Sequence, residues 1–359
     1  MQTYSRDSNP EVFSFQALWD TVTRIFSGYL PANDAHYVAG CLVEAEARGV
    51  QSHGIGRIPV YTQRLRLGVV NAKPTFKISA GSGATAHVEG DNGMGYLVAR
   101  KAMDEAIRRG REHGISLVLA SQSNHFGMAA TYLQQAIDAG LAALVLTNAP
   151  PLMPVWGGRS AFLGTSPFAF AAPSQHTPVM LDMATSVVAF GKIRQAARRG
   201  ESIPADWALD AQGQSTTSPD AALNGVVLPM GGPKGSGLGL MMELIAGVMS
   251  GSAFGGEVRN QNSDFEHPQN VGHAFITFRP DIAVTLSDYF ARADSLVDRA
   301  KASPRAEGFD NIVMPGETEA QRAEKAKREG IAVSRQDTVM LHDELMLAAE
   351  ARPLSAAPR

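Results

Sequence analysis

Cysteine is nearly absent from this 359-residue chain, in which Cys41 is the only one. A single thiol excludes a disulfide framework within the chain and a cluster of cysteine metal ligands. Cys41 stands at helical spacing with Val38 and Ala45, which predicts a small buried core residue. No HExxH motif and no paired-cysteine spacing occurs, so the sequence predicts no metal site.

Charge is also scarce, and long apolar runs are missing. Charged residues make up 19% of the chain and the net charge is −3, whereas typical soluble proteins contain about 25% charged residues. This balance lacks the positive patch that binds nucleic acid or anionic lipid. The longest nearly apolar stretch, 238–249, contains Glu243 and is too short to span a bilayer. Because residues 1–10 lack the apolar core of a signal peptide, we expect a cytoplasmic protein without membrane or nucleic-acid partners.

Glycine, in contrast, is abundant. It accounts for 35 of the 359 residues, whereas proteins usually contain about 7%. Together with the low charge, this composition predicts extensive burial, a subunit interface, and places where the backbone approaches a ligand closely.

Apolar periodicity predicts alternating helices and strands in the first half of the chain. We expect helices at 33–48, 59–67, 95–109 and 128–138, and buried strands at 115–120 and 141–146. The two strands flank the last of these helices, which favours parallel pairing between them. The loop 121–127 then follows the carboxyl end of a strand, where open α/β sheets bind ligands.

The second half has a different pattern. Residues 167–172 and 178–183 are expected to form paired strands, followed by a helix at 184–193. An apolar helix is predicted at 238–249. From about residue 284 the chain is mostly charged amphipathic helix, which indicates an outer helical lobe.

His53 lies in a loop between the end of one predicted helix and the start of the next. Arg57 and Tyr61 are four residues apart on that next helix and so share a face. Because a helix N-terminus favours an anion, a carboxylate held by Arg57 would lie within reach of His53. Oxidation of a hydroxy acid needs such a fork for the carboxylate and a base for the hydroxyl proton. The alternative is a solvated rim of polar side chains.

His125 lies in a second loop, bounded by Ser123 and Gly127, before a helix N-terminus. The helix dipole disfavours imidazolium, so we expect a lowered pKa of His125 and a neutral ring that accepts or orients. The alternative is a structural hydrogen bond near the helix N-cap.

Asp182 ends an apolar run, and Lys234 stands in the glycine-rich segment 231–239. The carboxylate at a strand end would orient an imidazole, bind a ribose hydroxyl or cap the next helix. Flexible backbone amides, Lys234 and a helix N-terminus suit a phosphate group. The segment is neither a Walker loop nor the dinucleotide fingerprint. A nicotinamide cofactor would therefore not bind in an ordinary Rossmann crevice.

Taken together, these segments resemble the malate/L-lactate dehydrogenase family, which lacks the usual Rossmann fold. That family includes ureidoglycolate dehydrogenase, diketogulonate reductase, sulfolactate dehydrogenase and Δ1-piperideine-2-carboxylate reductase. Order and spacing match from about residue 15 to 320. The matching segments are SHGIGRIPVY (52–61), SNHFG (123–127), TNAP (147–150), GTSP (164–167), DMATS (182–186), LPMGGPKG (228–235) and MPGE (314–317).

The resemblance implies an α/β fold and a homodimer. It implies an unusual mixed-sheet NAD(P)-binding domain over 76–284 and a helical substrate and dimerisation lobe over 1–75, joined by 285–359. It also implies that NAD or NADP exchanges a hydride with the 2-carbon of a small 2-hydroxy or 2-oxo carboxylate substrate, of the malate, lactate or sulfolactate type.

Site residues follow from the same resemblance. Members of the family have their proton-transfer residue at the position of His53 or of His125. We predict His53 as the acid/base and His125 as a pocket residue, with Ser52 and Asp182 in support. Arg57 and Tyr61 would bind the substrate. The cofactor would contact Val179, Met180, Leu181, Asp182, Met183, Ala184, Thr185, Pro233, Lys234, Gly316, Glu317 and Thr318.

Two departures from the family pattern leave the reaction class in place but leave the substrate and the cofactor open. Ser166 replaces the usual asparagine, and Ala149 replaces a serine that some relatives carry. One alternative is an NADPH-dependent reductase of a cyclic imino acid. Independently of these departures, an alternative of another class is a non-catalytic protein that binds an acidic metabolite. The segment around Lys234 argues against this second alternative, because a sensor of a small acid needs no phosphate site.

Overall fold

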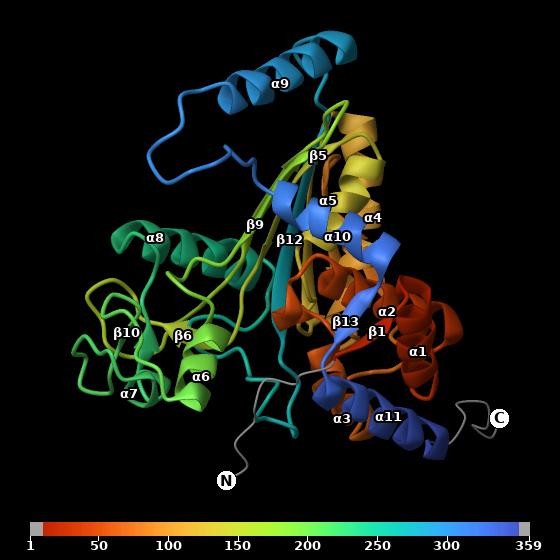
Figure 1. The fold of residues 1–359 in the computed structure, drawn as a ribbon. Helices are drawn as coiled ribbons and strands as arrows, with labels where there is room; N and C mark the ends of the chain where they lie inside the picture. The colour runs from red at the N-terminus through yellow and green to blue at the C-terminus, as the bar shows by residue number, and fades with distance from the viewer. Residues whose placement is uncertain (1–9, 352–359) are drawn as a thin grey trace, which may run out of the picture.

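A mixed seven-stranded sheet forms the centre of the computed structural model, which describes residues 10–351 (Figure 1). In spatial order the strands are β2 (Lys77–Ala80), β3 (Thr85–Glu89), β4 (Ile115–Ser123), β12 (Val271–Phe278), β5 (Ala142–Thr147), β8 (Phe168–Ala172) and β9 (Val179–Met183). All neighbouring strands are antiparallel except β3 and β4, which are parallel. The fold is therefore mixed α/β, as predicted.

The predicted parallel pairing of β4 with β5 is wrong. β12 lies between these strands and pairs with both of them antiparallel. It is buried along nearly its whole length, and such an apolar strand gains most from a central position with both faces covered. The predicted hairpin of β8 with β9 is confirmed.

The two faces of the sheet are covered unequally (Figure 1). α4 (Gly95–His113) and α5 (Ala130–Asp138) pack on one face. α8 (Pro233–Met242) and the π-helix η3 (Glu243–Val248) lie against the other. The helix predicted at 238–249 thus begins earlier, at Pro233, a residue that suits the first helical turn. Most of the glycine-rich segment is therefore helical.

A helical lobe joins the two ends of the described chain. Its helices share one hydrophobic cluster, which includes Phe26, Leu42 and Leu341. Cys41 belongs to the same cluster and is a buried free thiol, as predicted. The domain boundaries at 75 and 285 stay a prediction. The lobe comprises β1 (Glu11–Phe13), α1 (Phe15–Ser27), α2 (Ala32–Ala47), α3 (Ile58–Arg66), α10 (Glu317–Glu329), β13 (Ile331–Val333) and α11 (Arg335–Glu350).

Two further parts extend from the sheet. α9 (Leu286–Lys301) projects beyond one end of it and has no buried residue (Figure 1). A small unit has its own core around Ile193 and Val227. Its α6 begins at Phe190 and not at residue 184 as predicted. The remaining elements are β6 (Pro151–Met153), β7 (Leu163–Gly164), α6 (Phe190–Arg199), β10 (Ala208–Leu209), α7 (Pro219–Leu223) and β11 (Val226–Val227).

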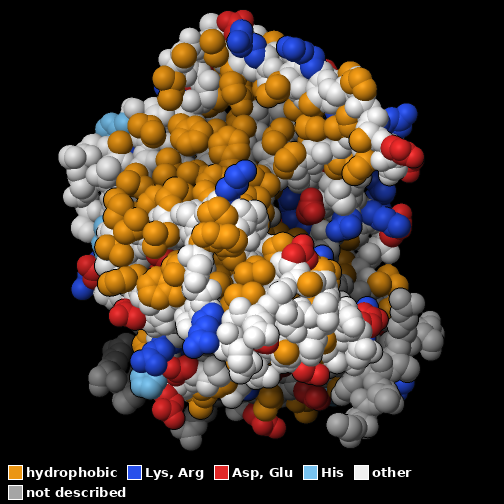
Figure 2. Space-filling model, turned by 90° about the vertical axis from the view of Figure 1, so that its left-hand side faces the viewer, with side chains coloured by type: hydrophobic (Ala, Val, Ile, Leu, Met, Phe, Trp, Pro, Cys, Tyr) orange, Lys and Arg blue, Asp and Glu red, His pale blue; other side chains and the backbone are white. Residues whose placement is uncertain are grey.

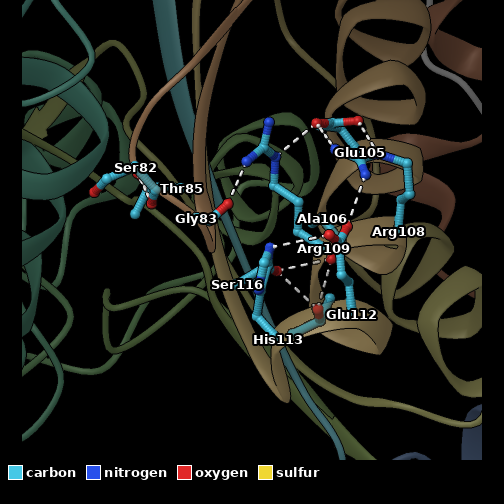
Figure 3. A network of polar contacts seen from close by, with 11 residues as sticks. Ser82, Gly83, Thr85, Glu105, Ala106, Arg108, Arg109, Glu112, His113 and Ser116 are labelled. Carbon is cyan, nitrogen blue, oxygen red and sulfur yellow. Dashed lines mark hydrogen bonds and ion pairs between the residues drawn. The ribbon is translucent and has the colours of Figure 1, made fainter.

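A polar network fastens the last turns of α4 to the sheet (Figure 3). Arg109 donates to Glu105 at 2.6 Å and to the carbonyl of Gly83, in the turn between β2 and β3. Ser116, at the start of β4, donates to the carbonyl of Ala106 at 2.8 Å. α4 is thereby fixed to the strand that ends in the His125 loop.

Within residues 10–351, no helix is long and apolar enough to cross a membrane. The same part of the chain contains no group of three or more potential metal ligands. The prediction about a signal peptide falls on residues 1–10, of which 1–9 lie outside the described residues. The predicted cytoplasmic location stays a prediction.

Candidate active site

His53 lies on a short bridge between α2 and α3. The bridge consists of two single 3-10 turns, η1 (Gln51–His53) and η2 (Ile55–Arg57). Ser52 Oγ lies 2.8 Å from His53 Nδ1, and Arg57 Nε donates to the Ser52 carbonyl at 2.6 Å. Arg57 directly precedes α3, the helix that carries Tyr61. These bonds place imidazole and guanidinium on the same loop.

Glu46, on α2, stabilises this bridge through its carboxylate. It accepts a hydrogen bond from the Ile55 backbone at 3.1 Å. A side chain on Gly54 would collide with the same carboxylate, so glycine permits the close approach. Burial raises the pKa of Glu46. The role of Glu46 could not be predicted from the sequence, because an acidic residue on a predicted helix carries no signal without the fold.

His125 follows the end of β4 and meets His53. The two imidazole rings are stacked, with 5.3 Å between centroids and 20° between planes. Tyr61 Oη lies 2.7 Å from His125 Nδ1, and Tyr61 is buried. The backbone nitrogen of His125 donates to Gln269 at 3.0 Å. The structure thus gives Tyr61 an imidazole as its partner, and the predicted substrate contact of Tyr61 stays a prediction.

Both imidazoles favour the neutral form. Burial, and then the charge of Arg57, lower the pKa of His53 to about 4. Burial lowers the pKa of His125 well below its usual value, with further contributions from His53, Arg57 and His273. Burial and neighbouring charges therefore account for the low pKa of His125, for which the sequence suggested the helix dipole. A neutral ring at pH 7 is able to accept a proton from a hydroxyl group.

His273, a third histidine, lies fully buried on β12 behind the His125 loop. Its Nδ1 lies 2.7 Å from Thr147 Oγ1, and its Nε2 lies 2.7 Å from Ser123 Oγ. Its ring stacks on Phe126 at 4.7 Å. His273 therefore joins three central strands beneath the site. No local sequence pattern marks His273, because its neighbours come from distant segments.

We predict that His273 makes folding stability depend on pH. Burial lowers its pKa from 6.5 to about 3. Between these pH values the unfolded chain binds the proton and the folded chain does not, so stability falls as pH falls. In urea unfolding between pH 6 and 4, His273→Asn should reduce the slope of the unfolding free energy against pH. The expected reduction is up to about 1.4 kcal/mol per pH unit. If the unfolding free energy has the same slope against pH in the wild-type protein and in His273→Asn, His273 does not cause the pH dependence.

A cavity of about 580 Å³ opens beside His53. Its walls come from the His53 bridge, the start of α5, strand β9 and the segment 313–319. Several predicted residues that are far apart in the sequence therefore share one space. Those that line it are Ser52, His53, Met180, Leu181, Asp182, Ala184 and Gly316.

Asp182 lies in the wall of this cavity, but its carboxylate faces α5. Asp182 Oδ2 accepts from the Ala130 backbone at 2.8 Å, which satisfies a free N–H at the helix start. Burial raises the pKa of Asp182. Within the described residues no hydrogen bond joins Asp182 to His53. Asp182 thus caps a helix, which was one of its three predicted roles. The helix is α5, however, and not α6, the next helix along the chain.

Gly316 closes the opposite wall against β9. Its φ is +84°, and a Cβ there would lie 2.7 Å from the Met180 carbonyl oxygen. The Met180 backbone donates to the Pro315 carbonyl at 3.0 Å. Glu317 instead pairs with Lys301 at 2.7 Å. The volume of the cavity lies within the range of small-molecule and cofactor sites.

Lys234 and Pro233 do not line this cavity. They lie in the first turn of α8, and both are exposed. α8 nevertheless begins beside β9, because Gly235 packs against the carbonyl of Thr185. Four other predicted cofactor contacts do not line the cavity but are next in sequence to residues that do. They are Val179, Met183, Thr185 and Thr318.

Comparison with known proteins identifies the family. The sequence model of the protein family described as malate/L-lactate dehydrogenase matches residues 13–341 of this chain. L-Sulfolactate dehydrogenase of Methanocaldococcus jannaschii is 39% identical over 298 residues, which cover 83% of this chain and 86% of that protein. Ureidoglycolate dehydrogenase (NAD(+)) of Escherichia coli K12 is 33% identical over 305 residues, covering 85% and 87%. (2R)-3-Sulfolactate dehydrogenase (NADP(+)) of Chromohalobacter salexigens is 37% identical over 256 residues, covering 70% and 75%.

A solved structure agrees with these sequences. Sulfolactate dehydrogenase from Methanocaldococcus jannaschii superposes with a TM-score of 0.89 at 34% identity, covering 94% of this chain and 98% of that one. The protein is therefore an oxidoreductase that acts on CH–OH groups, in a class of enzymes that uses a nicotinamide cofactor. The chain belongs to the malate/L-lactate dehydrogenase family, as its motifs predicted.

Proposed function

We propose that this protein transfers a hydride between NAD or NADP and the 2-carbon of a small 2-hydroxy or 2-oxo acid, of the malate, lactate or sulfolactate type. One observation carries the proposal. A neutral imidazole, His53, lines a large cavity and shares its loop with the guanidinium of Arg57. Arg57 itself is not among the residues that line the cavity, but its place on the same loop would bring a carboxylate fork to a substrate that His53 serves as a base.

The bound nicotinamide would supply or accept the hydride. Residues of the chain bind the substrate and transfer the proton. Arg57 binds the substrate carboxylate through its terminal nitrogens, since its Nε is already bonded to Ser52. His53 takes the hydroxyl proton during oxidation and returns it during reduction. Ser52 orients His53 through Nδ1, which leaves Nε2 for the substrate. His125 lies against His53 and is held by Tyr61.

The cofactor would lie along β9 and the segment that contains Gly316. The seven residues of 179–185 and residues 316–318 remain our proposed contacts, with Pro233 and Lys234 on the adjoining turn of α8. Relatives use either cofactor, because one is named for NAD(+) and another for NADP(+). The choice is therefore a matter for experiment.

Absorbance at the reduced-nicotinamide band tests the reaction. Both cofactors are to be assayed against a panel of 2-oxo acids and cyclic imino acids. Turnover of oxo acids supports the proposal, and turnover of cyclic imino acids alone would favour the imino acid reductase. If neither cofactor binds in a fluorescence titration, the protein is instead a binding protein for an acidic metabolite.

We also propose that two copies associate through the less covered face of the sheet, and not through the helical lobe to which the family resemblance assigned dimerisation. Hydrophobic side chains spread over this side of the molecule (Figure 2). Leu240, Leu244 and Val248 are exposed on α8 and η3. Leu117 and Leu144 of the sheet are only partly buried. A second copy would supply the missing layer, because a monomer seldom exposes so broad an apolar patch.

Light scattering after size exclusion tests the dimer. We expect twice the chain mass of 38.2 kDa. Leu244→Asp should shift the protein toward the single chain, because a charge would enter the apolar contact. The control is Val339→Asp on α11, a similarly exposed apolar site outside this face. A monomeric wild-type protein would contradict the proposal.

A further inference from the structure

Arg48 follows the last residue of α2 and lines the cavity beside His53. Its side chain is only 11% exposed. Among the residues of the described chain that line this cavity, Arg48 is the only arginine or lysine, and the predicted phosphate residue Lys234 lies outside it. A polyanion bound in this cavity therefore has one cation to pair with, and such pairing offsets the cost of removing its charge from water.

The guanidinium of Arg48 has terminal nitrogens that are free to bind more strongly. Its Nε donates to Glu44 at 2.9 Å, which fixes the direction of the side chain. Nη1 lies 3.9 Å from the sulfur of Met180, and Nη2 lies 3.5 Å from the side-chain oxygen of Gln134. Both acceptors are uncharged, and the second contact is longer than the usual range of about 2.7–3.2 Å. A phosphate, which a guanidinium binds through two parallel hydrogen bonds, would replace both contacts.

Arg48 also lines a second cavity, of about 480 Å³, whose walls come from α2, α5 and α10. The two cavities share Arg48, Met128 and Ala130 in their walls, so they adjoin at this arginine. Thr131, in the wall of the second cavity, has a buried hydroxyl without a hydrogen-bond partner in the described chain. Because an unpaired buried hydroxyl is costly, a polar group of a ligand in this cavity would stabilise it.

A nicotinamide dinucleotide has a matching form, since a negatively charged diphosphate joins its two nucleosides. We propose that Arg48 binds the diphosphate of the cofactor, and that the adenosine half extends past Arg48 into the second cavity while the nicotinamide half lies beside His53. This inference rests on the proposed function. It places the diphosphate at the cation that both cavities share. Lys327, the other cation of the second cavity, already lies 3.9 Å from Glu44 and 3.7 Å from Glu324.

Fluorescence titration with NADH and with NADPH measures this contact without turnover. Arg48→Ala should raise the Kd of both cofactors by a similar factor of about 10- to 150-fold, as for a lost hydrogen bond to a charged group. Arg48→Lys should restore part of the affinity, because it keeps the charge but not the planar fork. The control is Arg328→Ala, an exposed position of α10 that lines neither cavity, which should leave both Kd values unchanged.

Competition against NADH separates a phosphate contact from a purely structural role. Adenosine and ADP differ only in the diphosphate. We expect the wild-type protein to bind ADP more tightly than adenosine, and Arg48→Ala to lose most of this preference while its affinity for adenosine stays the same. Ala320→Phe, in the α10 wall of the second cavity, should weaken the binding of both adenosine and ADP but not that of nicotinamide mononucleotide.

Other results would overturn particular parts of the inference. An unchanged preference for ADP in Arg48→Ala would remove the diphosphate contact, and a rise in Kd confined to NADPH would assign Arg48 to the 2′-phosphate instead. Equal losses for adenosine and ADP in that variant would show that Arg48 only supports the cavity wall. Unchanged adenosine binding in Ala320→Phe would refute the place of the adenosine half. A wild-type protein that binds neither cofactor would reject the proposed function itself. Equal melting temperatures of the variants confirm that they fold.

Discussion

His53→Ala is expected to lower kcat by at least about 100-fold with the fold intact. Proton transfer by a positioned side chain contributes roughly 100- to 10,000-fold. His53 is the histidine that lines the cavity, and Ser52 orients it through Nδ1. The measurement is steady-state turnover with saturating cofactor and substrate. His176→Ala is the control, because His176 is exposed and outside the cavity.

The pH profile sharpens this test. For hydroxy acid oxidation, the imidazole must be neutral, so kcat/KM should fall as pH drops through the pKa of His53. Burial and Arg57 place that pKa at about 4. The acidic limb should therefore lie well below pH 6.5 and disappear in His53→Ala. If turnover and pH profile are unchanged in that variant, His125 becomes the proton-transfer residue.

The second large effect is expected at Arg57. Arg57→Ala should lower kcat/KM by about 10- to 150-fold, mainly through KM, because a hydrogen bond to a charged group contributes about 1.5–3 kcal/mol. Arg57→Lys should restore only part of it, since an ammonium cannot form the bidentate contact. Arg328→Ala, an exposed position on α10, is the control.

Initial rates over a range of oxo acid concentrations measure this effect. The carboxylate role is refuted if Arg57→Ala keeps both KM and kcat/KM. A loss confined to kcat would point to a different role, in which Arg57 serves only to hold the Ser52 carbonyl and thereby the His53 bridge.

Local signals in the sequence predicted most elements but not how they assemble. The β8–β9 hairpin follows from two short apolar runs close together in the chain. β12 could not be placed in this way, because its partners β4 and β5 are more than 100 residues away. Its insertion is decided by burial in the assembled sheet, which no local pattern reports.

The same distinction holds for the site. Motifs in order indicated His53, His125 and the β9 segment, but only the fold shows that the two imidazoles stack. Glu46 and His273 escaped prediction because each acts through contacts that residue spacing does not reveal. The helix that carries Tyr61 was predicted, but its hydrogen bond to His125 was not. That bond forms because the loop after β4 lies beside α3 in the folded chain.

The most direct test of the account follows an isotope through the reaction. The enzyme is supplied with oxaloacetate and with NADH or NADPH that carries deuterium on the transferring carbon of the nicotinamide ring. We predict a hydroxy acid with that deuterium on its 2-carbon and a solvent proton on its oxygen. A product whose 2-carbon carries hydrogen from solvent, formed while the cofactor keeps its deuterium, would contradict direct hydride transfer in this site.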